Sequence, residues 1–121
     1  MRAVGIGFRA AAELSSLQDA LQKALSLNGT KIDAIVTESA KSREKVFREL
    51  AAVLQVPGLG IAPRDLEQMI TPTQSQRIQD RFGTGSLAEA AALVAAGPTA
   101  RLVVERVISS DGMATAAIAE S

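Results

Sequence analysis

Gly83-Thr84-Gly85-Ser86-Leu87-Ala88-Glu89-Ala90-Ala91-Ala92-Leu93 joins a glycine-rich turn to the start of an alanine-rich helix. Ser86 and Glu89 have the spacing of a capping box, in which the serine side chain accepts a bond from the third N–H of the helix and the glutamate reaches back to the serine N–H. We therefore expect a helix that begins sharply at Leu87.

The same segment is a candidate ligand-binding site. Gly83 and Gly85 permit close approach of another group, and the N–H groups at the positive end of a helix dipole can receive a carboxylate. The alternative is an ordinary turn in front of a capped helix. We predict that Gly83, Thr84, Gly85, Ser86 and Glu89 contribute to ligand binding.

Composition restricts the class of protein. The 121 residues, 47% of them hydrophobic, fit one compact domain. Thirteen basic and thirteen acidic residues cancel without long runs of one sign, so no nucleic-acid partner is expected. No stretch is long and apolar enough to span a membrane, and the N-terminal residues lack a signal peptide's apolar core, which predicts a soluble cytoplasmic protein with no membrane partner.

The chain contains no His, Cys, Trp or Tyr. Histidine-dependent triads, cysteine nucleophiles and zinc sites of imidazole or thiolate are therefore excluded. We predict no metal ligands and no cofactor, and no catalytic residue can be identified from the sequence. A binding function is favoured over an enzymatic one.

Strand and helix patterns alternate in the first half of the chain. Arg2 to Phe8 is typical of a buried strand, and a helix capped by Ser15 or Ser16 follows. Ile32 to Val36 is again strand-like, and the apolar spacing predicts a second helix from Ser39 to Leu54. This alternation favours helices packed on a sheet.

The second half of the chain is expected to supply the remaining strands of the sheet. After a short strand and a short helix between residues 59 and 69, Thr73 and Gln76 form another capping-box pattern, for a helix ending near Phe82. Residues 102–108 and 113–119 predict an antiparallel hairpin around Ser109-Ser110-Asp111-Gly112. The expected fold is a single α/β domain over residues 1–121, with a mixed sheet flanked by helices.

Two cationic side chains lie at positions where they could bind a ligand. Arg9 follows the first strand, where a guanidinium can fork onto a carboxylate; its alternative is a surface ion pair. Lys41 lies at a predicted helix start, where the dipole disfavours it; its alternative is a pair with Glu44. Gly5-Ile6-Gly7 is half of a dinucleotide fingerprint and lacks the third glycine, so we do not expect a dinucleotide.

Ligands of open α/β sheets bind beyond the carboxyl ends of the strands. Topology would bring Arg9, Lys41, Thr71 and Ser75 to that rim, together with the Gly83–Ser86 turn. This set is the predicted ligand-binding site.

Five segments occur in this order along the chain: Gly5-Ile6-Gly7-Phe8-Arg9, Thr37 with Lys41, Thr71-Pro72-Thr73-Gln74-Ser75, Gly83 to Leu93, and Asp111 to Ala119. Together they resemble the CobE proteins of cobalamin biosynthesis, which are similar to the C-terminal domain of CbiG. The resemblance implies a three-layer α/β domain and, as ligand, a corrin or precorrin intermediate, a tetrapyrrole that bears acetate and propionate groups. Other cobalamin biosynthesis enzymes are possible partners.

The resemblance implies two activities. CobE-like proteins belong to the oxygen-dependent route, which favours binding or handing on an intermediate. CbiG-like proteins open the lactone of cobalt-precorrin-5A and release acetaldehyde, but this chain lacks their N-terminal portion and has Glu105-Arg106 where the family often has a lysine. An enzyme would need Glu89, Glu38 or Asp111 as its base. A non-catalytic partner of another pathway enzyme is the third hypothesis.

Overall fold

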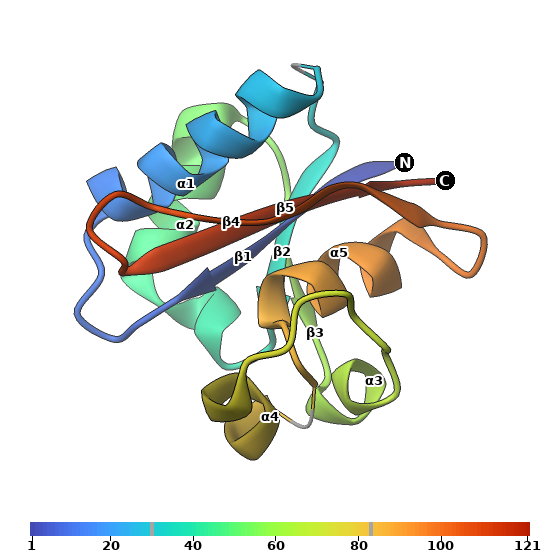
Figure 1. Ribbon diagram of the computed structural model, residues 1–121. Coiled ribbons are helices and arrows are strands. Elements are labelled where there is room, and N and C mark those ends of the chain that lie inside the picture. The colour runs from blue at the N-terminus through green and yellow to red at the C-terminus, as the bar shows by residue number, and fades with distance from the viewer. Residues whose placement is uncertain (30, 83) are drawn as a thin grey trace.

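The computed structural model describes residues 1–29, 31–82 and 84–121, and they form one mixed sheet with helices on both faces (Figure 1). The strands are β1 Arg2–Phe8, β2 Ala34–Glu38, β3 Gly58–Ile61, β4 Arg101–Ile108 and β5 Ala114–Glu120. Strand β1 pairs in parallel with β2 and antiparallel with β5, and the sheet order is β3-β2-β1-β5-β4. The mixed sheet and its C-terminal hairpin confirm the predicted fold class.

The helices make the outer two layers. Helices α1, Leu14–Leu27, and α2, Lys45–Leu54, cover one face of the sheet, while α3, α4 and α5 lie on the other (Figure 1). The last three span Pro63–Glu67, Gln76–Phe82 and Leu87–Ala96. The helical crossovers therefore build the parallel half of the sheet, and the hairpin completes it on the far side of β1.

Side chains of different size occupy the two faces of β1. Val4, Ile6 and Phe8 pack with α1 and α2 in one core cluster. Ala3 belongs to the cluster on the α5 side, and a Cβ placed on Gly5 would lie only 1.8 Å from the carbonyl oxygen of Ala88. Helix α5 thus rests directly on the backbone of the central strand.

Helix α5 is an interior helix. Every residue from Leu87 to Ala92 is buried, and apart from Leu87 and Glu89 all of them are alanine. Small side chains permit this close approach because they add little bulk between helix axis and sheet. The alanine run is therefore required by the packing on β1.

The predicted cap of the first helix is wrong. Helix α1 begins after Glu13, whose backbone N–H donates to Oγ of Ser16 at 3.4 Å. Ser16 lies inside the first turn, and its hydroxyl donates to Asp111 at 2.5 Å. The serine joins the helix to the hairpin turn, which only the tertiary fold could reveal.

The second helix is also shorter than predicted. The strand before it runs two residues further, to Glu38, and the carboxylate of Glu38 accepts the N–H groups of Ala40 and Lys41. These bonds close a 3-10 turn, η1 (Lys41–Arg43), and an extended Glu44 separates it from α2. A continuous helix from Ser39 is therefore wrong.

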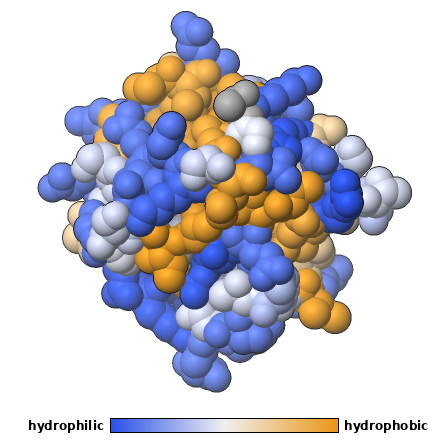
Figure 2. All heavy atoms as spheres, turned by 45° about the horizontal axis from the view of Figure 1, so that its top comes forward, coloured by the Kyte–Doolittle hydropathy of each residue, from blue (hydrophilic) through white to orange (hydrophobic). Residues whose placement is uncertain are grey.

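Hydrophobic side chains are exposed beside hydrophilic ones on one face of the molecule (Figure 2). Figure 2 turns the top of Figure 1 toward the viewer and shows apolar atoms among hydrophilic ones on that face. Leu27 and Val53 are exposed apolar side chains of α1 and α2. No helix in the described ranges has the length and apolar character needed to cross a membrane.

Replacing Gly5 by alanine tests the contact between α5 and β1. We expect Gly5→Ala to lower the free energy of unfolding by about 3 kcal/mol or more, because the new methyl group meets rigid backbone atoms. Gly112→Ala is the control: its Cβ has open space, and its φ of 73° costs about 1–2 kcal/mol. Chemical denaturation measures both, and equal losses would contradict the close packing.

Candidate functional site

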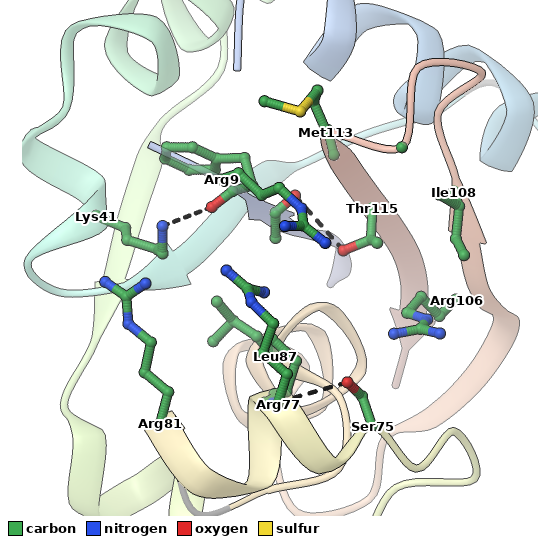
Figure 3. Close-up of a pocket in the computed structure, with 15 residues that line it drawn as sticks. Arg9, Lys41, Ser75, Arg77, Arg81, Leu87, Arg106, Ile108, Met113 and Thr115 are labelled. Atoms are coloured by element: carbon green, nitrogen blue, oxygen red, sulfur yellow. Dashed lines mark hydrogen bonds between the residues drawn. The ribbon is translucent and has the colours of Figure 1, made fainter. Parts of the chain in front are cut away.

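A pocket of about 260 Å³ opens at the edge of the sheet where β1 and β4 end and β5 begins (Figure 3). Helix α4 forms its opposite wall. The pocket is lined by Gly7, Phe8, Arg9, Lys41, Ser75, Arg77, Ile78, Arg81, Leu87, Arg106, Ile108, Gly112, Met113, Ala114 and Thr115. It lies at the rim that the topology predicted.

Five cationic side chains surround the pocket: Arg9, Lys41, Arg77, Arg81 and Arg106. None of the described lining residues is acidic. Figure 3 shows Arg77 rising from α4 toward Arg9, with Arg81 below Lys41 and Arg106 on the β4 side. Since like charges gathered without carboxylates repel one another, the arrangement favours an anionic ligand.

Apolar side chains lie between these cations in the lining: Phe8, Ile78, Leu87, Ile108 and Met113. Within the described part of the chain, no ion pair is found for Arg9, Arg77 or Arg106. Guanidinium groups beside an apolar surface can bind carboxylates in bidentate fashion. The charges and the apolar side chains of the pocket therefore favour an anionic molecule that also has an apolar part.

Lys41 is the most buried of the five cations. Its ammonium donates to the carbonyl oxygen of Phe8 at 2.6 Å and lies 4.4 Å from the centre of the Phe8 ring. Burial lowers the pKa of Lys41, and the nearby Arg81 guanidinium lowers this pKa further. No ion pair between Lys41 and Glu44 is found among the described residues. The ammonium is instead bonded to the end of β1 through the Phe8 carbonyl.

Helix α4 carries Arg77 and Arg81 one turn apart. Oγ of Ser75 accepts the N–H of Ile78 at 3.4 Å, and the Ser75 carbonyl accepts the N–H of Gln79 at 2.8 Å. Ser75 therefore starts this helix, and the predicted capping box of Thr73 and Gln76 is wrong because Thr73 is engaged elsewhere.

Glu89 is fully buried and engages Thr73. Its carboxylate accepts the N–H of Thr73 at 2.9 Å, the hydroxyl of Thr73 at 2.8 Å and the N–H of Arg106 at 2.8 Å. The Ser86 half of the predicted capping box is confirmed, since Oγ of Ser86 accepts the N–H of Glu89 at 3.3 Å. The other half is wrong, because Glu89 joins the 71–75 loop to β4.

A bulge in β4 makes this contact possible. Val104 pairs with Ile118 and Val107 with Ala116, so three steps along β4 correspond to two along β5. The extra residue frees the N–H of Arg106 for Glu89. The Arg106 side chain lines the pocket beside β4 (Figure 3).

Three predicted ligand-binding residues, Arg9, Lys41 and Ser75, line the pocket. Four others, Thr71, Thr84, Ser86 and Glu89, are buried within the fold. Gly85 packs against the 71–75 loop, because a Cβ there would lie 2.6 Å from Oε1 of Gln74. Gly83 lies outside the described residues. Ligand contact by all nine residues stays a prediction.

Sequence reasoning missed Arg77, Arg81 and Arg106. The first two have the i, i+4 spacing of one helical face directly after Ser75, and that spacing was an available signal. Arg106 follows Glu105, and the two lie between the apolar residues Val104 and Val107 of β4. Only the bulge determines which of these two faces the pocket.

The three carboxylates considered as general bases all accept backbone N–H bonds. Glu38 holds the turn after β2, Glu89 holds Thr73 and Arg106, and Asp111 accepts the N–H of Met113 at 3.0 Å. The hydroxyls of Ser109 and Ser16, followed by the Met113 N–H, lower the pKa of Asp111 to about 2. Among the described residues, no group of three Asp or Glu side chains could hold a metal ion.

Glu89→Gln tests the buried carboxylate. Both carboxylate oxygens face donors that include a backbone N–H, so either orientation of an amide places its NH2 group against one of them. We expect the free energy of unfolding to fall by about 1–3 kcal/mol. Thermal and chemical denaturation would show the loss. Wild-type stability in the variant would mean that these bonds contribute nothing.

Asp111 makes stability depend on acidity. Its pKa in the folded protein, about 2, lies below the ordinary aspartate value of 3.8, so its contribution to stability is complete above about pH 4 and is lost as the pH falls toward about 2. Denaturation across this range should show a steeper loss for wild type than for Asp111→Asn. Parallel curves would contradict this assignment.

Comparisons with known proteins agree on one family. The family model for the cobalamin synthesis G C-terminus matches residues 2–119. The structure of CobE, a protein from the cobalamin biosynthetic pathway, is 29% identical with a TM-score of 0.84, over 98% of this chain and 92% of that one.

Cobalamin biosynthesis protein chiG from Agrobacterium tumefaciens is 32% identical with a TM-score of 0.77, over 100% of this chain and 98% of that one. A cobalamin biosynthesis protein G homologue from Sulfolobus solfataricus, 22% identical, shares the fold with a TM-score of 0.72, over 98% of this chain and 36% of that one. No curated protein matches significantly in sequence. The chain therefore belongs to the cobalamin synthesis G C-terminal family, the CobE-like and CbiG-like proteins of cobalamin biosynthesis.

Proposed function

We propose that this protein binds a carboxylate-rich tetrapyrrole, a precorrin intermediate of the oxygen-dependent cobalamin route, and hands it on. The observation that carries the proposal is the pocket, in which five cationic side chains lie among apolar ones and no acidic residue is found in the described lining. Precorrins combine an apolar ring with acetate and propionate groups, so they match this surface in charge and polarity.

The size of the pocket suggests how such a ligand would lie. Pockets that enclose a drug-sized molecule have volumes of roughly 300–1,000 Å³. At about 260 Å³, this pocket is smaller than a whole macrocycle requires. One edge of the ring would enter, its carboxylates would pair with the arginines, and the remaining ring would stay exposed. An exposed ring is accessible to a second protein, which suits transfer.

The carboxylates support binding over lactone hydrolysis. Each of the three candidate bases, Glu38, Glu89 and Asp111, accepts backbone N–H bonds that hold the fold together. Asp111, with a pKa of about 2, is also a poor proton acceptor at neutral pH. A general base must also lie within reach of the substrate, and none of the three lines the cationic pocket.

Titration with metal-free and cobalt-containing corrinoid intermediates tests the proposal. Visible absorbance reports binding, and chromatography of the released ligand reports conversion. We expect saturable binding with the ligand recovered unchanged. A converted ligand, with acetaldehyde released, would show a lactone hydrolase. Absence of binding to every intermediate would overturn the proposal and favour a role as partner of another pathway enzyme.

Single arginine variants locate the site. We expect Arg77→Gln and Arg106→Gln each to weaken binding about 10- to 100-fold, equivalent to loss of a charged hydrogen bond of about 1.5–3 kcal/mol. Arg48→Gln is the matched control, since Arg48 is exposed on α2 and does not line the pocket. Equal affinities in all three variants would place the ligand elsewhere.

A further inference from the structure

Two separate segments carry cations on opposite sides of the pocket. We call residues 71–82 the α4 arm; it contributes Ser75, Arg77 and Arg81. We call residues 105–108 the β4 arm; it contributes Arg106 and Ile108. An anionic ligand that touches both arms must match the distance between them.

Glu89 bonds to both arms from beneath the pocket. One carboxylate oxygen accepts the N–H of Thr73, and the other accepts the Thr73 hydroxyl and the N–H of Arg106. All three distances lie between 2.8 and 2.9 Å, and the side chain has no exposed surface. A single rigid group thus connects the start of the α4 arm to the β4 arm.

Where Glu89 bonds to it, neither arm is held by the hydrogen bonds of a helix or of the sheet. Thr73 lies in a loop, between Thr71 and the start of α4. Arg106 lies in the bulge of edge strand β4, where its N–H has left the β4–β5 ladder. A bond from Ser75 N–H to the Gly85 carbonyl, at 2.8 Å, also secures the α4 arm, but it does not reach β4.

We infer that Glu89 is a positioning residue that fixes the separation of the two arms, so that the pocket selects its ligand by the spacing of the ligand's anionic groups. This inference deepens the proposed function, because selection by spacing requires an anionic ligand. The positioning itself can be measured without any ligand.

The conservative variant Glu89→Gln keeps the shape of the side chain and removes one acceptor. Its NH2 group must face either the N–H of Thr73 or the N–H of Arg106, and two donors repel each other. The variant therefore releases one arm whichever way the amide turns. Thr73→Val is milder, since it removes the hydroxyl donor and keeps the backbone bond.

Spin labels measure the distance between the arms. The chain has no cysteine, so labels can be attached uniquely after Gln79→Cys and Glu105→Cys, at exposed positions that do not line the pocket. Pulsed electron resonance should give a broader or shifted distance distribution in Glu89→Gln than in the labelled parent. Ile35→Val, which removes a buried methyl group on the α1 side, should leave the distribution unchanged.

A distribution in Glu89→Gln that coincides with the parent's would overturn the positioning role. Where Glu89→Gln does not fold, Thr73→Val decides instead: a smaller change in the same direction supports the role, and an unchanged distribution overturns it.

Isomeric dicarboxylates test selection by spacing. Phthalate, isophthalate and terephthalate have the same charge and differ in the separation of two carboxylates on an apolar ring. We expect the unlabelled wild type to prefer one isomer, and Glu89→Gln to bring the ratios of affinities toward one. Equal affinity of the wild type for all three isomers, or unchanged ratios in the variant, would overturn selection by spacing. Failure of wild type to bind any corrinoid intermediate would overturn the proposed function, while the spin-label result would still decide the positioning role.

Discussion

The contact between α5 and the backbone of β1 is the constraint on which the site depends. Because Gly5 has no side chain, the helix lies directly on the central strand, at a distance that only small residues permit. That position puts the first turn of α5 at the carboxyl end of β1. Leu87 then lines the pocket, and Glu89 lies between the 71–75 loop and β4.

The charge of the site is local. The chain has thirteen basic and thirteen acidic residues, so no overall field draws anions to it. Five of the basic side chains nevertheless line one pocket, and the neighbouring carboxylates accept backbone N–H bonds instead of pairing with these cations. Glu89 lies behind the wall with its oxygens on backbone N–H groups, and Glu38 closes the turn that carries Lys41. Attraction for an anion therefore arises from where the carboxylates point and not from an excess of cations.

The sequence was sufficient for the fold because periodicity and turn residues are local signals. The alternating first half and the hairpin around Ser109–Gly112 determined a mixed sheet, and its carboxyl rim placed Arg9, Lys41 and Ser75 together. The sequence did not predict the structure where a side chain bonds to a distant segment. Ser16, Thr73 and Glu89 all have the chemistry of helix caps, yet tertiary partners engage each of them. Arg106 depends on a bulge, which strand patterns do not reveal.

Lys41 and the arginines serve the site in different ways. The Lys41 ammonium is buried against the Phe8 ring and bonded to the Phe8 carbonyl, so it shapes the floor next to Arg9. A guanidinium is larger and planar, and could not take this place without displacing the ring. Arg77 and Arg81 instead stand exposed on a short helix. The rigid part of the pocket is therefore formed by β1, Lys41 and α5. The arginines of α4 would reach a bound ligand from a segment whose position depends on its bonds to that rigid part.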